Sequence, residues 1–455
     1  MKKRFKDQLL KKQLEEHLIY GPMKAAELCA NLDISQPVFS RLTSQMKDRI
    51  LIAGRARSTR YAARRHIPGI GMHIPIYEIG DGINQTRKLA VLHAKEPSGF
   101  YLEPETEDIQ AKFFDDLPYF LDNMRQSGFL GRLIPKRHIE LELPQDIQLW
   151  STDHCLNYCV HYGWNLPGNF ILGDEAFRLY LSHSQANYDT IDLQDRIRVY
   201  PERADAVLSA GPPGSSAVGE QPKFLAVLSP EPTHVLVKFS HRICDATSQR
   251  LADLLVCEHI ALKILAQHGQ TVAKSELLIS ADRVFLEVKR FDRVGAHGRR
   301  GTLSLTALDA EFIGLLTNWK DSAAALLRLH HIDQNAYDQI LWWQVFGHLI
   351  ANTDMHHGNL SFLTRSTSIL GVAPVYDMSP MLYAPVQGQL IERTFSPPLP
   401  APSETAIWRE VHGAALDFWL SVIDEDRISK KFRIIAEKNV ETVDALKKFG
   451  DLLPQ

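Results

Sequence analysis

A chain of 455 residues is too long for one ordinary hydrophobic core, so the sequence predicts two or three domains. Its composition, 45% hydrophobic and 23% charged, is that of a folded, soluble protein, and its five scattered cysteines argue against a disulfide framework. No apolar run approaches the ~20 residues that cross a bilayer, so we expect a cytoplasmic protein with no membrane partner.

Three helical patterns open the chain, over residues 5–19, 23–32 and 36–46. A tight turn precedes the third, which starts with a Ser-Gln-Pro sequence suited to a capped helix start. This order predicts a helix-turn-helix, whose second helix is expected to present side chains that contact bases or phosphates. Those side chains are Gln36, Ser40, Arg41 and Ser44. The residues expected to face inward on the first two helices are Leu9, Leu10, Leu14, Leu18, Ala26, Leu28, Cys29 and Leu32.

Residues 50–65 are predicted to form two short strands around a basic tip, which is the wing of a winged helix. Arginines at such a tip contact DNA phosphates and add affinity without sequence information. The tip arginines are Arg55, Arg57 and Arg60. The net charge of −3 names no partner, but the basic residues gather at this end and favour DNA as the partner. The alternative is a helical dimerisation or protein-docking domain.

The middle of the chain mixes strand-like and helical patterns. Strands are expected over residues 72–79, 88–94 and 99–103, and a helical segment over 115–133. Two histidines and two cysteines lie close together further on, but their spacing matches no common zinc site, so ordinary packing is the favoured interpretation. These residues are His154, Cys155, Cys159 and His161.

A stretch rich in Gly, Pro, Ser and Ala covers residues 204–222 and precedes two apolar runs joined by Pro-Glu-Pro. The stretch is either an interdomain linker or a glycine-rich loop in front of a β-hairpin. In the second interpretation it is the phosphate loop of a nucleotide site. The candidate phosphate-loop residues are Gly214, Ser215, Ser216, Gly219 and Lys223.

Lys238 ends the second strand of that hairpin, and a strong amphipathic helix over residues 246–269 carries Glu258. Another strand is expected over 284–294. From there to the C-terminus helical patterns dominate, which gives a two-lobed outline. These patterns cover residues 326–351, 408–424 and 438–453.

Asp354 and Asn359 have the D-x-x-x-x-N spacing of a kinase catalytic loop, and Asp377 follows a short strand soon after. Phosphoryl transfer needs a carboxylate to accept the hydroxyl proton, oxygen ligands for Mg²⁺ and a cation over the phosphates. Asp354 is the candidate base, Asn359 and Asp377 are the candidate metal ligands, and Lys238 is the candidate cation. Each motif is weak alone, but their order along the chain is specific.

The segments that carry these residues resemble the HipA-like serine/threonine kinases, which are toxins of toxin–antitoxin modules. The resemblance covers about the last three quarters of the chain, and the fused helix-turn-helix makes it similar to the standalone YjjJ (HipH) type. It implies ATP and Mg²⁺ as cofactors, a protein substrate, and a HipB-type antitoxin as a further partner. It also implies that Asp354 is the base, that Asn359 and Asp377 bind metal, and that Lys238, paired with Glu258, holds phosphates. The remaining nucleotide-pocket positions that it implies are Lys289, Phe291, Asp292, His356 and Tyr376.

The resemblance implies an α+β chain: a winged helix-turn-helix over residues 1–66, a kinase-like N-lobe with a HipA N-terminal subdomain over 67–291, and a helical C-lobe over 292–455. Two departures stand out. Val218 occupies the position of the family's regulatory serine, which puts self-inactivation in doubt, and Lys289 replaces a glutamate that is frequent at the hinge. Two other functions stay open: a transcription regulator whose kinase-like body senses nucleotide, and a metal-dependent nuclease acting on DNA.

Overall fold

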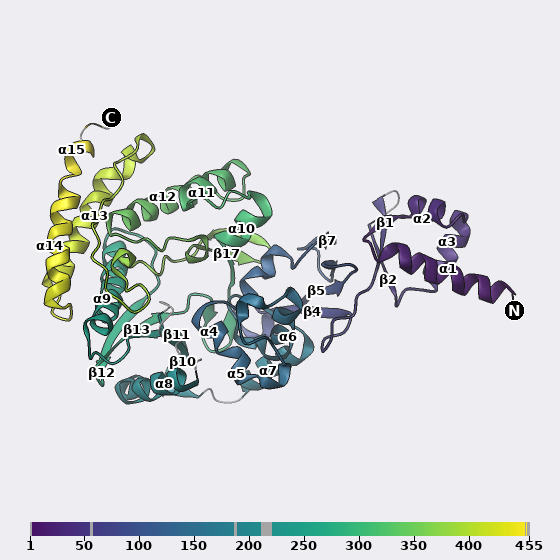
Figure 1. Cartoon of the computed structure of the whole chain (residues 1–455), viewed down its shortest axis with the longest axis horizontal. Helices are drawn as coiled ribbons and strands as arrows, with labels where there is room; N and C mark the ends of the chain where they lie inside the picture. The colour runs from purple at the N-terminus through teal and green to yellow at the C-terminus, as the bar shows by residue number, and fades with distance from the viewer. Residues whose placement is uncertain (1, 55–57, 186–188, 211–220, 451, 453–455) are drawn as a thin grey trace. The chain divides into compact units, whose positions relative to one another are not determined.

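The computed structural model describes residues 2–54, 58–185, 189–210, 221–450 and 452 (Figure 1). Helices and mostly antiparallel sheets make up the described chain, so the expected α+β class is confirmed. The chain divides into two compact units. The first contains Met1–Arg125 and Trp150–Gln185, and the second contains Gln126–Leu149 and Ala186–Gln455. The three-domain division at residues 66 and 291 stays a prediction. None of the described helices combines the length and apolar character needed to cross a bilayer.

The first unit begins with three helices and a three-stranded sheet in the order β1-β3-β2. The elements are α1 (Lys2–Leu18), β1 (Met23–Lys24), α2 (Ala25–Asn31), α3 (Gln36–Ser44), β2 (Ile50–Ala53) and β3 (Arg60–Ala63). Leu14, Leu28 and Phe39 pack at the centre of their core. Leu9 and Ala26 were expected to face inward but are exposed. At 100° per residue, Leu9 lies about 100° around its helix from the buried Leu10, and Ala26 lies about 200° around its helix from the buried Leu28.

The rest of the first unit is built on a five-stranded antiparallel sheet in the order β7-β6-β5-β4-β8. Its strands are β4 (His73–Glu78), β5 (Arg87–Ala94), β6 (Phe100–Pro104), β7 (Lys112–Phe114) and β8 (Phe170–Leu172), and α6 (Thr152–Tyr162) and α7 (Asp174–Gln185) accompany them. The three strands expected here are present. The helical segment expected over 115–133 is instead two short helices, the 3-10 helix η3 (Tyr119–Met124) in this unit and α4 (Gly128–Arg132) in the second unit. Gly128 interrupts the run with a φ of +63°.

The second unit contains a five-stranded sheet in the order β12-β13-β11-β10-β9. Its strands are β9 (Thr190–Asp192), β10 (Lys223–Ser229), β11 (Thr233–Phe239), β12 (Ser275–Ser280) and β13 (Arg283–Lys289). Helix α8 (Arg196–Ala210) packs through Tyr200 against the face that carries Val237 and Phe239. Lys238 points to the other face, because side chains alternate along a strand. Residues 204–210, expected in a loop, are the end of α8.

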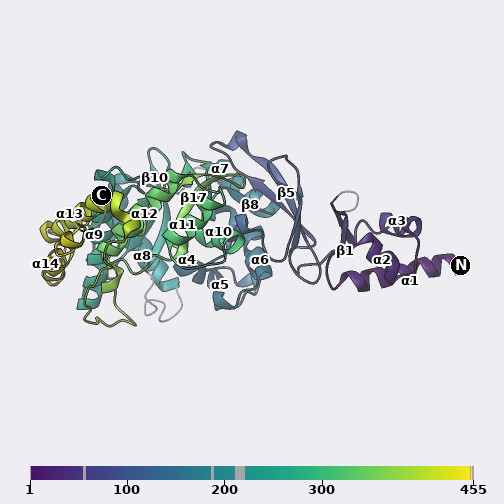
Figure 2. The same ribbon diagram turned by 90° about the horizontal axis from the view of Figure 1, so that it is seen from above.

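Helices dominate the remainder of the second unit, and Figures 1 and 2 show α13 and α14 side by side. The run expected over 326–351 is two helices, because His330 adopts a φ of +59° and Asp333 caps α12 through a 2.8 Å bond from the Ala336 amide. Likewise, Ser429 caps the start of α14, well before the expected residue 438. The bounds are α9 (Ala246–Gln267), α10 (Leu305–Phe312), α11 (Trp319–Arg328), α12 (Gln334–Leu349), α13 (Thr405–Asp424) and α14 (Lys430–Asp444). A small sheet joins β16 (Gly301–Ser304), β17 (Ser361–Arg365) and β18 (Ser368–Val372).

Candidate active site

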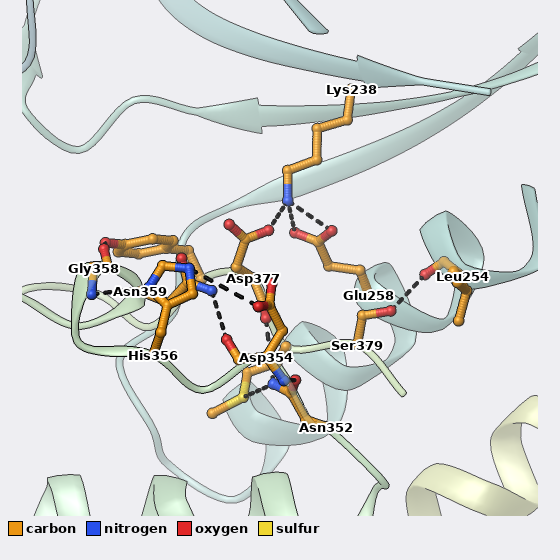
Figure 3. A network of polar contacts seen from close by, with 12 residues as sticks. Lys238, Leu254, Glu258, Asn352, Asp354, His356, Gly358, Asn359, Asp377 and Ser379 are labelled. Atoms are coloured by element: carbon orange, nitrogen blue, oxygen red, sulfur yellow. Dashed lines mark hydrogen bonds and ion pairs between the residues drawn. The ribbon is translucent and has the colours of Figure 1, made fainter. Parts of the chain in front are cut away.

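Three charged side chains from distant parts of the second unit meet at Lys238 (Figure 3). Its ammonium group, on β11, donates to the two carboxylate oxygens of Glu258, on α9, at 2.7 and 2.8 Å. It also contacts the carboxylate of Asp377, which is 139 residues further along the chain. Lys238 and Glu258 are 5% and 4% exposed, so this pair is held away from water. A long helix and a central strand thus fix one cation at a defined point.

Burial and charge together set the protonation states of this cluster. Burial alone would lower the pKa of Lys238, but the carboxylates of Asp377 and Glu258 raise it above its ordinary value. Burial also works against ionisation of Asp377, yet the adjacent Lys238 holds the pKa of that carboxyl below its usual range. The pKa of Glu258 is raised, chiefly by burial. The result is a fixed ammonium group beside an ionised Asp377.

Asp377 and Asp354 are carried by two neighbouring loops that Asn352 ties together. Asn352 accepts a 3.0 Å bond from the Asp354 amide and directs its own amide group toward the Asp377 carbonyl oxygen, 3.4 Å away. Asp377 has a φ of +58°, a conformation that costs energy for a residue with a side chain and that recurs at functional sites. Asn352 was not among the residues expected at the site. Its signal was the Asn-Thr-Asp order, since asparagine often bonds the backbone two residues on.

The catalytic-loop motif itself is folded into a tight turn. Asn359 donates from Nδ2 to the carbonyl oxygen of Asp354 at 2.9 Å, which orients its Oδ1 as the other polar atom of the amide. Tyr376 donates to the Gly358 carbonyl oxygen at 3.0 Å. His356 Nε2 lies 4.0 Å from the Asp354 carboxylate, whose pKa burial raises above its ordinary value. Asp354 remains half exposed, at 52% of its side chain, and can therefore meet a substrate.

The donor set fits a magnesium ion shared with a nucleotide. Asp377 offers a carboxylate and Asn359 an amide oxygen, which are hard ligands of the kind that Mg²⁺ takes from a protein while phosphates and water complete its shell. Within the described residues, no three His, Cys, Asp or Glu side chains are grouped so as to hold a metal by themselves. The zinc alternative finds no support there either: Cys159 is buried and its thiol donates to the Met124 carbonyl oxygen.

A buried polar network under the catalytic loop was not anticipated. The Ser322 hydroxyl donates to Asp309 Oδ2 at 2.6 Å and lies 2.9 Å from His357 Nε2. Asp309 and Ser322 are fully buried, and His357 is 8% exposed. Trp319 adds a 3.0 Å bond from its indole nitrogen to the His356 carbonyl oxygen. The network therefore anchors the loop residues that directly precede Asn359 to α10 and α11.

Some of the other nucleotide-site candidates lie near the Lys238 cluster, and others are exposed or already paired with arginines. Lys223 lies directly opposite Lys238 in the β10–β11 pair. The centre of the Phe291 ring is 5.7 Å from that of Tyr376, the residue before Asp377. Both candidates therefore lie near the Lys238 cluster. Lys289 ends β13 and is exposed. The Asp292 carboxylate accepts bonds from Arg290 at 2.8 and 3.0 Å and from Arg293 at 2.7 Å. A ribose contact by Asp292 would thus compete with two guanidinium groups.

Several candidates lie outside the described residues. These are the phosphate-loop positions Gly214, Ser215, Ser216 and Gly219, together with Val218 and the wing-tip arginines Arg55 and Arg57.

The remaining DNA candidates are all exposed on the first unit. Gln36, Ser40, Arg41 and Ser44 share α3, and Arg60 starts β3. Three of them already have partners: Arg41 forms a 2.9 Å ion pair with Asp7, the Ser44 hydroxyl donates to the Ser40 carbonyl oxygen at 2.7 Å, and the Gln36 side-chain oxygen accepts a 3.4 Å bond from the Cys29 thiol. Such a surface ion pair is weak, and a phosphate can displace it.

Comparison with known proteins assigns the class. A model of the HipA-like C-terminal domain matches residues 215–430, and a model of the middle domain of YjjJ-like toxins matches residues 70–181. Toxin YjjJ of Escherichia coli strain K12 is 35% identical over 438 residues, which cover 95% of this chain and 97% of that protein. The chain therefore belongs to the HipA-like toxin family, which confirms the resemblance inferred from its motifs.

Two solved structures are also similar. HipA of Shewanella oneidensis MR-1, solved in complex with HipB and its operator DNA, has a TM-score of 0.46 at 15% identity and covers 82% of this chain and 95% of its own. The proinflammatory kinase CtkA of Helicobacter pylori has a TM-score of 0.34 at 16% identity and covers 51% of this chain and 92% of its own. The family assignment is independent of both.

Proposed function

We propose that this protein is an ATP- and Mg²⁺-dependent serine/threonine protein kinase that acts as a toxin and binds DNA through its N-terminal winged helix. One observation carries the proposal: Lys238, Glu258 and Asp377 converge in the second unit, and Asp354 lies beside them on the neighbouring loop. A cation, a residue that fixes it, a metal carboxylate and a base are the parts that phosphoryl transfer requires.

Each residue has one task in this scheme. Lys238 holds the nucleotide phosphates, and Glu258 fixes the ammonium group in place. Asp354 accepts the proton of the substrate hydroxyl, for which its half-exposed carboxylate is suited. Asp377 and Asn359 would hold Mg²⁺, which supplies positive charge to the phosphoryl oxygens as the bond to the leaving group breaks. The substrate is a protein, and a HipB-type antitoxin is a further expected partner.

The N-terminal elements support the DNA-binding part of the proposal. Helix α3 follows α2 after a short turn and exposes polar and basic side chains, and β2 and β3 flank the tip of the proposed wing. The Arg60 side chain is exposed at that hairpin. A recognition helix that reads bases and a basic hairpin that contacts phosphates would together hold the chain on duplex DNA.

The proposal is tested by following phosphate from labelled ATP. The purified full chain, incubated with a cell lysate, γ-labelled ATP and Mg²⁺, is expected to label one or a few proteins on serine or threonine. Asp354→Asn is the matched control and should label none. A parallel incubation with plasmid DNA and Mg²⁺ distinguishes the nuclease alternative. ATP binding without transfer would favour a nucleotide-sensing regulator, and DNA cleavage that is lost in Asp354→Asn would favour the nuclease.

A further inference from the structure

Helix α1 has an apolar side that its own core does not use. Leu14 faces that core and is fully buried. On the outer side of the helix, Phe5 and Leu9 are 72% and 50% exposed, and Ile19 and Tyr20, which follow its last turn, are 47% and 87% exposed. Isolated exposed apolar residues are ordinary, but a row of them on one helix marks a contact surface.

The row has an internal symmetry. At 100° per residue, Phe5, Leu9, Lys12, Glu16 and Ile19 fall on one side of the helix, and we call these five residues the outer stripe. Leu9 is three residues before Lys12 (12 − 9 = 3), and Ile19 is three residues after Glu16 (19 − 16 = 3). From Leu9 to Ile19 the stripe runs apolar, charged, charged, apolar when read in either direction, and the two charges have opposite signs.

We propose that the outer stripe binds the outer stripe of a second copy of this chain, antiparallel and around a two-fold axis between Lys12 and Glu16. In that register Lys12 faces Glu16 of the partner subunit, and the symmetry makes this pair twice. Leu9 then faces Ile19 of the partner subunit, because both pairs have the same sum of residue numbers (9 + 19 = 12 + 16). A two-fold contact requires a self-complementary surface of this kind.

The charges are available for this contact. Within one chain, Lys12 and Glu16 are 3.8 Å apart and keep 76% and 57% of their side chains exposed, so the internal pair holds them only weakly. Two helices of 17 residues form an interface below the usual size for stable complexes, so we expect a dimer that dissociates in the micromolar range. The inference concerns α1 alone and does not depend on the proposed kinase activity.

Sedimentation velocity of the full chain over a range of micromolar concentrations tests the proposal. Wild type is expected to shift from monomer to dimer. Lys12→Glu and Glu16→Lys each place like charges together twice and should raise the dimer dissociation constant about tenfold or more. An equimolar mixture of these two variants restores both opposite-charge pairs and should dimerise again, which no effect within one helix can produce.

Two further variants complete the experiment. Leu9→Glu should abolish the dimer and leave the melting temperature unchanged, since Leu9 is exposed. Lys6→Glu, about 100° around the helix from Phe5, is the charge-matched control and should dimerise as wild type does. A wild type that stays monomeric, or a mixture no more associated than its components, would overturn the proposal. A monomer that binds anionic vesicles instead would assign the stripe to a membrane surface and would overturn it equally.

Discussion

Lys238 places a positive charge between the carboxylates of Glu258 and Asp377 and offsets part of their negative charge. A variant that removes the ammonium group would leave buried carboxylates without a partner, which is strongly destabilising. Loss of activity in such a variant could therefore reflect loss of the fold. Asp354 is a better probe, because half of its side chain is exposed and its removal leaves no buried charge unpaired.

We expect Asp354→Asn to abolish phosphoryl transfer and toxicity while the fold persists. The amide is nearly the same shape as the carboxylate but cannot accept the hydroxyl proton, and loss of a general base costs on the order of 10²–10⁴ in rate. Transfer of labelled phosphate and the melting temperature are the measurements. Wild-type transfer by the variant would rule out Asp354 as the base.

The network under the catalytic loop gives a second expectation. His357→Ala removes the link to Ser322 and leaves that hydroxyl and Asp309 buried with one partner fewer. We expect kcat to fall about tenfold or more with little change in KM for ATP, because the loop that carries the base is displaced while the Lys238 cluster is untouched. His357→Gln, which keeps a donor, should recover part of the rate. Equal loss of rate in both variants, or a rise in KM alone, would contradict a positioning role.

Site residues that lie close together in a sequence motif could be predicted, and those that lie far apart and match no motif could not. Asp354 and Asn359 belong to one short motif, and its order along the chain after Lys238 and Glu258 and before Asp377 indicated a catalytic loop. Asp309, Ser322 and His357 lie up to 48 residues apart (357 − 309 = 48), and their types and spacing match no motif. Only the packing of α10 and α11 against the loop brings them together. The sequence could not predict the ion pairs of Asp292 with Arg290 and Arg293 either, because they depend on the rotamers of the two arginines.

At the scale of elements, periodicity located strands and helices well and their ends poorly. Strands β4, β5, β10 and β11 were expected from alternating apolar residues, and they are present. The run over residues 326–351 was predicted as one helix, because apolar spacing continues across the break. What separates α11 from α12 is the Asp333 cap and the left-handed His330. Local hydrogen bonds of this kind override a continuous apolar pattern.

The two elements that we propose to contact DNA should behave differently. Replacing Arg55, Arg57 and Arg60 by Ala should weaken binding to every DNA sequence and flatten its salt dependence, because wing arginines contact phosphates. Replacing Gln36 or Arg41 should reduce discrimination between sequences, by about 1–3 kcal/mol for each lost base contact. Titrations of specific and random duplexes at several salt concentrations measure both effects. A chain that binds no duplex at low salt would exclude the assignment.

The segment between α8 and β10 gives the next expectation. A phosphate on a loop serine adds about two negative charges beside the nucleotide phosphates and would expel ATP, but Val218 has no hydroxyl at the family's serine position. We therefore expect no self-inactivation during long incubation with ATP and Mg²⁺. Intact-mass analysis and peptide mapping across residues 210–223 check this. Stoichiometric phosphate on Ser215 or Ser216, with matching loss of activity, would mean that the switch has moved to a neighbouring residue.

At the scale of the whole molecule, buried histidines make stability depend on pH. Burial lowers the pKa of His234 and of His259 to about 4, against about 6.5 in an unfolded chain. Between these two pKa values each histidine is largely protonated in the unfolded state and largely neutral in the folded state. The stability that these two histidines contribute is therefore fully present above about pH 6.5. It decreases as the pH is lowered, by up to about 1.4 kcal/mol per pH unit for each histidine.

Urea unfolding at about pH 7 and about pH 5 measures this loss. His234→Gln keeps a donor for the Ala296 carbonyl oxygen and removes one titrating group, so its stability should fall less between the two pH values than that of wild type. His183→Gln is the control, because it makes the same exchange at an exposed position. Identical pH dependence in wild type and His234→Gln would exclude His234 as a source.

The separation of 139 positions between Lys238 and Asp377 also matters while the chain is being made. A ribosome that adds about 5–20 residues per second needs roughly ten seconds to pass from one to the other. During most of that interval the nascent chain has Lys238 and Glu258 but lacks Asp377, whereas the core of the first three helices is complete within the first 63 residues. Translation therefore completes the N-terminal module first and the candidate site late. A translation product that ends before residue 377 lacks one of the three charged residues of that site.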